Sequence, residues 1–180
     1  LETILLKLAG MNFFDAINNS MSNIASGGFS SKNESIAYWN DVPIIQYIII
    51  FFMFLAGTNF ILIYFGLTGN FKKAIKNTEF KWYISLIGLF VILVTLTLFF
   101  SVDLTKTSVY HPQIYGELES SFRHSLFQVV AIVTTTGFVT GDFISWGPFL
   151  TMFFFAIMFL GGSSGSTSGG VKILRHLILI

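Results

Sequence analysis

The chain has 180 residues, of which 53% are hydrophobic and only 11% are charged, and its mean hydropathy is +0.74. A soluble domain of this size needs a more highly charged surface, so the composition predicts an integral membrane protein. The net charge of +1 gives no basic surface for nucleic acid, and the lack of cysteine excludes disulfide bonds and cysteine-based metal sites.

The first predicted element is a short helix within residues 11–25, which is too short and too polar to cross a bilayer. A glycine-rich loop follows at 26–30, and a polar loop continues to residue 42. The uncharged run 43–67 is long enough to span the membrane, and Pro43 suits the first turn of its helix.

Residues 68–81 carry four lysines against the single acidic residue Glu79, so the positive-inside rule places this loop in the cytoplasm. The uncharged run 82–102 then predicts a helix that crosses outward. A linker, 103–119, leads to a second short helix at 120–133.

A second glycine-containing loop lies at 134–138, and a helix is predicted to run inward from Trp146 to about Leu160. A tract of ten small and polar residues then interrupts the helix, which resumes at Val171. The tract consists of Gly161, Gly162, Ser163, Ser164, Gly165, Ser166, Thr167, Ser168, Gly169 and Gly170. Lys172 and Arg175 fall at the expected cytoplasmic end.

The sequence contains an internal repeat. Placing Gly28-Phe29 on Gly137-Phe138 also pairs the two short helices, for example Ile17 with Leu126 and Asn19 with Gln128. After a length difference of four residues in the following loop, 53–57 matches 158–162. Each copy therefore reads as short helix, Gly-Phe loop, outer linker and spanning helix, which favours a duplication over chance similarity of apolar helices.

A loop exposed to hydrocarbon would leave backbone groups unpaired at several kcal/mol each, so a loop at membrane depth must line water or be buried in protein. Glycines let successive carbonyls turn toward one axis, where a ring of them replaces the hydration shell of a cation. The negative C-terminal end of each short helix adds to this preference. Ser26, Thr135 and Thr136 offer hydroxyl oxygens, which suit an alkali cation. The two loops therefore predict a pore for an alkali cation.

The tract at 161–170 has two interpretations. Small residues allow close packing of another helix, but ten of them in succession exceed that need. Our hypothesis is an unwound loop within the membrane, beneath the selectivity filter, that blocks or opens the pore.

The segments 9–16, 26–30, 52–59, 134–138 and 161–172 together resemble the bacterial Trk/Ktr potassium-uptake membrane subunits of the TrkH type. The resemblance covers essentially the whole chain. It implies an all-α membrane protein of the K⁺-channel-like superfamily, built from repeated units of helix, pore helix, filter loop and helix. Family members have four such units around one pore, and this chain matches the second, without its first helix, and the third.

The resemblance also implies the roles of particular residues. The implied filter positions are Ala25, Ser26, Gly27, Gly28, Phe29, Thr134, Thr135, Thr136, Gly137 and Phe138, and the implied gating loop is the tract 161–170. Expected partners are membrane lipids, a second copy in a homodimer, and a cytosolic nucleotide-binding regulatory subunit like TrkA or KtrA, with Lys172 and Arg175 as its contacts. K⁺ is the expected transported ion, with no covalently bound cofactor and no enzyme activity, in the bacterial inner membrane.

These inferences divide the chain into 1–67 (pore helix, filter loop and second spanning helix of one repeat), the cytoplasmic loop 68–81, and the next repeat at 82–180. Two repeats cannot close a four-sided filter, so we do not expect this chain alone to conduct. The alternative function is a secondary transporter that binds a solute at broken helices, which shares the interrupted helix but leaves the two Gly-Phe loops unexplained.

Two enzyme interpretations are weaker. A phosphate-binding loop at 165–172 lacks the required Gly-Lys pair followed by Ser or Thr. A serine protease would need a histidine within hydrogen-bond reach of Ser164, and the nearest in sequence, His176, is about three helical turns away.

Overall fold

The structure is a computed structural model that describes residues 1–69, 75–101 and 114–179. Most of the predicted outer linker and part of the lysine-rich loop lie outside the described residues. The elements of the first half are α1 (Glu2–Leu8), α2 (Phe13–Ile24), η1 (Ser35–Trp39), α3 (Pro43–Ala56) and α4 (Phe60–Leu67). Those of the second half are α6 (Thr78–Ser101), α7 (Glu117–Val133), η3 (Phe143–Trp146), α8 (Pro148–Ile157) and α9 (Ile173–Leu179).

The predicted all-helical class is confirmed. Within the described residues, β pairing is limited to one isolated bridge between Leu160 and Val171. The short non-spanning helices appear as α2 and α7, although α7 begins three residues earlier than expected because Glu117 and Glu119 form its first turn. Acidic residues are favoured there because they face the positive end of the helix dipole.

One described helix, Thr78–Phe100 in α6, is long and apolar enough to cross a membrane by itself. The run 43–67 also passes this test, but only when α3 and α4 are taken together. These two helices are bent by 111° relative to each other, so the expectation of a single spanning helix from 43 to 67 is wrong. Asn59 caps the new helix, its side-chain oxygen accepting a hydrogen bond from Ile61 N at 2.9 Å.

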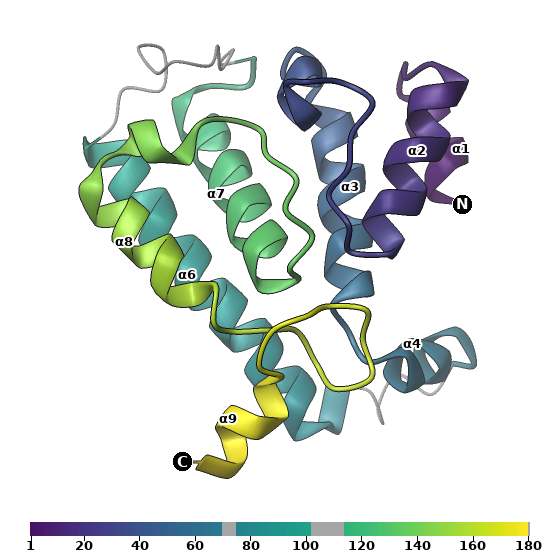
Figure 1. Cartoon of the computed structure of the whole chain (residues 1–180), viewed down its shortest axis with the longest axis vertical. Helices are drawn as coiled ribbons and strands as arrows, with labels where there is room; N and C mark the ends of the chain where they lie inside the picture. The colour runs from purple at the N-terminus through teal and green to yellow at the C-terminus, as the bar shows by residue number, and fades with distance from the viewer. Residues whose placement is uncertain (70–74, 102–113, 180) are drawn as a thin grey trace.

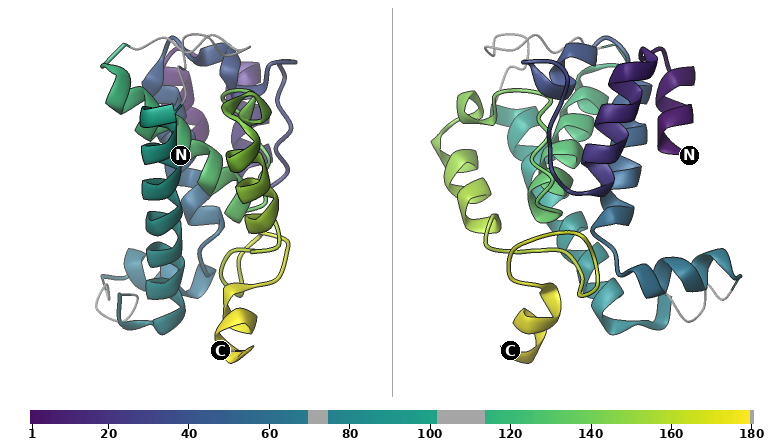
Figure 2. Two further views of the ribbon diagram at one scale, coloured as in Figure 1. Left: turned by 90° about the vertical axis from the view of Figure 1, so that its left-hand side faces the viewer. Right: turned by 45° about the vertical axis from the view of Figure 1, so that its right-hand side comes forward.

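The two repeated units have the same path through space. Figure 1 shows α2 and α7 descending in the same direction, each followed by a loop that turns back upward and by a descending helix, α3 or α8. Both α3 and α8 begin with a proline, Pro43 and Pro148, which are equivalent in the repeat. The turned views of Figure 2 preserve this arrangement and place the tract between α8 and α9 below the two loops.

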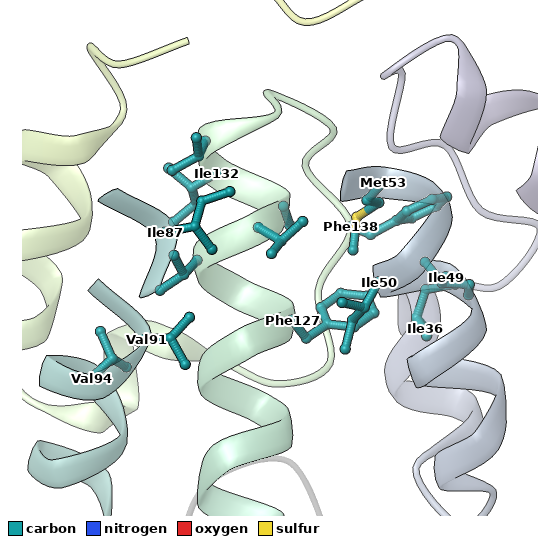
Figure 3. Packing of buried hydrophobic residues seen from close by; sticks show 14 of the residues in the cluster. Ile36, Ile49, Ile50, Met53, Ile87, Val91, Val94, Phe127, Ile132 and Phe138 are labelled. Atoms are coloured by element: carbon teal, nitrogen blue, oxygen red, sulfur yellow. The ribbon is translucent and has the colours of Figure 1, made fainter. Parts of the chain in front are cut away.

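The helix α7 lies at the centre of the packing. Figure 3 shows side chains of α6, among them Ile87 and Val91, on one side of α7, while Ile50 and Met53 of α3 lie on the other. All four are buried in the hydrophobic core. The second short helix is thus enclosed by the spanning helices of both units, which fixes the position of the loop that follows it.

Candidate ion-conducting site

Both short helices end in the same backbone turn. Ser26 and Thr135, which are equivalent in the repeat, have left-handed φ angles of 52° and 55°. In the first copy Gly27 N donates to Ser22 O at 2.8 Å, and the equivalent bond in the second copy is 2.9 Å long. This is the hydrogen-bond pattern of a Schellman motif, here with a non-glycine residue at the left-handed position. Such a residue costs roughly 1–2 kcal/mol, so the surrounding structure must hold it in place.

Two positions further on, Gly28 and Gly137 are also left-handed, with φ angles of 68° and 82°. In each loop every second residue therefore has positive φ. Glycine adopts this left-handed conformation without the steric cost that a side chain would add.

The two loops are in direct backbone contact. A Cβ atom added to Gly28 would lie 2.1 Å from the carbonyl oxygen of Thr136. Since only glycine permits this approach, Gly28 brings one loop against a carbonyl of the other. The predicted loop residues 25–29 and 134–138, separate in sequence, are thus brought together.

The hydroxyl groups of the loops have protein partners. Thr136 Oγ1 lies 2.8 Å from Thr134 Oγ1, and Thr134 Oγ1 also donates to Val130 O at 2.8 Å. Both threonines are buried. The hydroxyls of Ser26 and Thr135 instead form hydrogen bonds with the tract.

The equivalent phenylalanines differ in burial. Phe138 is fully buried and lies beside Met53 of the first unit's α3 (Figure 3). Phe29 is 80% exposed. The spanning helix that covers the second loop belongs to the preceding unit, and the first loop has no such helix among the described residues.

The chain that leaves each loop is held by the short helix of its own unit. In the first unit Ser31 Oγ donates to Asp15 Oδ1 at 2.5 Å. In the second, His124 Nδ1 lies 2.9 Å from Thr140 Oγ1. These pairs occupy equivalent positions of the repeat, which supports the duplication with side chains of different chemistry.

The first unit also forms hydrogen bonds with the second. The N–H groups of Ile36 and Ala37, in η1, both donate to Val139 O at 3.1 Å. Asn40 Nδ2 donates to Thr140 O at 3.0 Å. The stretch just beyond the second loop is therefore positioned by the linker of the first unit.

The tract forms a closed loop between α8 and α9. Its neck is formed by the bridge between Leu160 and Val171 and by a hydrogen bond from Gly161 N to Val171 O of 2.9 Å. Its ends are close together and it has no helix of its own, which is the geometry of an Ω-loop.

The tract contacts both Gly-Phe loops from below. Thr167 Oγ1 lies 2.9 Å from Ser26 Oγ, and Gly169 N donates to Thr135 Oγ1 at 2.6 Å. The two loop residues involved are the two left-handed ones. The same three segments meet in Figure 1, where the tract lies directly under both turns.

Comparison with known proteins identifies the family. Residues 4–180 match the family model TrkH, described as a cation transport protein. The chain belongs to the TrkH family. The predicted resemblance is thereby confirmed, and with it the prediction of a multi-pass membrane protein.

Among curated TrkH-family relatives, the Trk system potassium uptake protein TrkH of Escherichia coli K12 is 36% identical over 97% of this chain. TrkG of the same strain is 37% identical over 96%. The crystal structure of the potassium transporter TrkH from Vibrio parahaemolyticus superimposes with a TM-score of 0.84 at 34% identity and covers 98% of the chain. The chain spans only about a third of these relatives, 34%, 33% and 36% respectively.

The structure adds residues near the candidate site that sequence reasoning missed. Gly57, at the bend between α3 and α4, accepts a hydrogen bond from Ser163 N at 2.9 Å. A Cβ there would lie 2.5 Å from Tyr83 Oη and 2.6 Å from Thr134 Cγ2. The bend thus contacts both the tract and the second loop. The sequence feature that could have indicated Gly57 is its alignment with Gly162 in the repeat. These two glycines are in contact in the structure.

Glu79, predicted within the lysine-rich loop 68–81, lies in the first turn of α6 and is only 7% exposed. Its Oε1 atom accepts hydrogen bonds from the backbone N–H and the hydroxyl of Ser164. The partner of the Ser164 hydroxyl is therefore a carboxylate and not the histidine that a serine protease requires.

The two basic residues after the tract differ in their surroundings. Lys172 Nζ donates to the Oγ atoms of Ser166 and Ser168 at 3.3 and 3.1 Å, and to the backbone oxygens of both. Arg175 is exposed. Among the described residues, no group of three or more His, Cys, Asp or Glu side chains could hold a metal ion.

Proposed function

We propose that this chain contributes two sides of a K⁺-selective filter, formed by residues 25–29 and 134–138, in a complete K⁺-uptake protein. The observation that carries the proposal is the pairing of the loops. Both have the same alternating left-handed backbone, and the Thr136 carbonyl oxygen lies close to the place that a Cβ atom on Gly28 would occupy. Carbonyl oxygens arranged in this way are hard ligands that substitute for the water around an alkali cation.

The choice of K⁺ rests on the relatives, whose names describe potassium uptake. The C-terminal ends of α2 and α7 both point at the paired loops, and their negative partial charge favours a cation there. The exposed Phe29 supports further units beyond these two, because its equivalent Phe138 is covered by a helix of the neighbouring unit.

In this proposal the tract 161–170 is the gate. It lies across the ends of both loops and is bonded to their left-handed residues, so a cation leaving the filter in this direction meets it. An ion passes only if the tract moves. Its narrow neck allows it to shift as a unit while α8 and α9 stay in place.

The proposed partners are a second copy of the complete protein and a cytosolic nucleotide-binding regulatory subunit. The exposed Arg175, beside the tract, is the proposed contact for that subunit. Lys172 bonds the tract itself, so a subunit that displaced its ammonium group would disturb the tract directly.

The test is ion flux by the complete protein in liposomes. We expect K⁺ flux that Na⁺ does not match at equal concentration, as the potassium uptake named for the relatives suggests. Flux that saturates with an organic solute would instead favour the secondary transporter, which shares the broken helices but assigns no role to the paired loops.

A further inference from the structure

Glu79 is a buried carboxylate that the proposed filter does not use. It continues the buried face of α6, on which Tyr83, Ile87 and Val91 follow at helical spacing. A charged group in this position is costly unless it is paired or well hydrogen-bonded. Its hydrogen bonds therefore indicate what it does.

The partner of Glu79 is the tract. Oε1 lies 2.5 Å from Ser164 N and 2.6 Å from Ser164 Oγ, so both donors of one residue converge on one carboxylate oxygen. Hydrogen bonds to an ionised acceptor are roughly twice as strong as those between neutral groups. This contact joins residues far apart in the sequence and anchors the tract to the base of the spanning helix.

The same part of the tract has a second attachment. Phe60 N, at the start of α4, donates to Gly165 O at 3.2 Å. The residues at 164–165 are therefore held from α6 and α4, while Thr167 and Gly169 touch the Gly-Phe loops. The tract is fixed at its lower end by Glu79 and rests on the filter loops at its upper end.

We propose that Glu79 is a positioning residue that holds the tract against the Gly-Phe loops, so that a movement of the α6 base releases the tract. The inference rests on the proposed gating function but concerns the position of the tract, which can be measured without ion flux. Replacing the carboxylate removes two charge-assisted bonds and frees Ser164.

The experiment uses the complete protein with other cysteines removed and a reporter, Ser163→Cys. Ser163 is fully buried, and its hydroxyl has no hydrogen-bond partner among the described residues, so the replacement costs no side-chain bond. The probe is a membrane-impermeant, positively charged methanethiosulfonate applied from the cytoplasmic side. We expect Glu79→Ala to raise the modification rate at least about tenfold, the factor that corresponds to the loss of one hydrogen bond to a charged group.

The matched control is Glu117→Ala, which removes an exposed carboxylate from α7 and leaves the rate unchanged. Glu79→Gln gives a smaller increase than Glu79→Ala, because its amide oxygen still accepts from Ser164 N. Ser164→Ala removes only the hydroxyl donor, so we expect a small increase in the modification rate. This variant replaces Glu79→Ala in the test if Glu79→Ala does not fold.

An unchanged modification rate in folded Glu79→Ala and Ser164→Ala proteins overturns the inference. A raised rate with unchanged K⁺ flux supports the positioning role and counts against the tract as the gate. The two failures are thus distinguishable, because accessibility reports where the tract lies and flux reports whether it blocks the pore.

Discussion

Gly28 and Gly137 are equivalent residues with different surroundings. Both have positive φ, which disfavours any side chain, but a Cβ on Gly28 would also collide with Thr136 O. A Cβ on Gly137 would meet no heavy atom within 4 Å. Strain alone acts at Gly137, whereas strain and a backbone clash act together at Gly28.

We therefore expect Gly28→Ala to reduce K⁺ over Na⁺ selectivity more than Gly137→Ala, measured as flux ratios in liposomes. A left-handed alanine costs roughly 1–2 kcal/mol, which corresponds to a change of about fivefold to thirtyfold at most at Gly137 and a larger one at Gly28. Gly147→Ala is the control, because Gly147 has a φ of 109° and open space around it but lies outside the loops. Equal selectivity in all three variants would count against the loops as the filter.

The repeat in the sequence was enough to select these glycines, because glycine at matched positions can be read directly from the sequence. The repeat did not reveal that the two glycines have different surroundings. The contact between Gly28 and Thr136 joins two loops that only the folded chain brings together, so the difference in crowding has no local signal.

Among the elements, hydropathy predicted α6 well and the α3–α4 segment badly. The uncharged run 82–102 forms most of α6, and buried residues recur along one face of this helix, so length and composition suffice. The run 43–67 is equally apolar, yet it bends at Gly57-Thr58-Asn59. The carbonyl of Gly57 is bonded to the tract there, a partner that no hydropathy scale includes.

A buried polar network joins α3 to α7. Arg123 is fully buried, its Nε donates to Glu119 Oε1 at 2.9 Å, and its Nη1 donates to Gln46 Oε1. Gln46 Nε2 in turn donates to Asn40 Oδ1 at 2.6 Å. Because Asn40 also holds the chain beyond the second loop, the network connects helix packing to the proposed filter.

We expect Arg123→Met to lower the thermal stability of the complete protein in detergent. Methionine keeps much of the packing but leaves Gln46 and Glu119 without their cationic partner. Breaking a buried ion pair costs roughly 3–5 kcal/mol, and the lower end applies here since the Glu119 side chain is 22% exposed. The exposed Arg175→Met is the matched control, and an equal melting temperature in the two variants would contradict a structural role for the network.

The whole molecule brings three distant segments to one point, the two Gly-Phe loops and the tract. If the tract closes the pore, fixing it there must stop transport. Ser26 Oγ and Thr167 Oγ1 are 2.9 Å apart, and the chain contains no cysteine, so the pair Ser26→Cys and Thr167→Cys can be joined without competition inside this segment.

We expect the double variant to form a disulfide under oxidising conditions, to lose most of its K⁺ flux, and to regain it on reduction. Each single variant should be insensitive to oxidation. Full flux with the disulfide demonstrably formed would mean that ions do not need the tract to move.

The sequence by itself determined the membrane class, the two repeated units, the non-spanning helices, and the loops and tract as candidate sites. These follow from composition, hydropathy and spacing, which are properties of neighbouring residues. Only the tertiary structure decided the bend after Ala56, the contact of Gly28 with the second loop, and the anchoring of the tract by Glu79. Each depends on backbone groups or a buried charge finding partners far away in the chain, and such partners are fixed by how the helices pack.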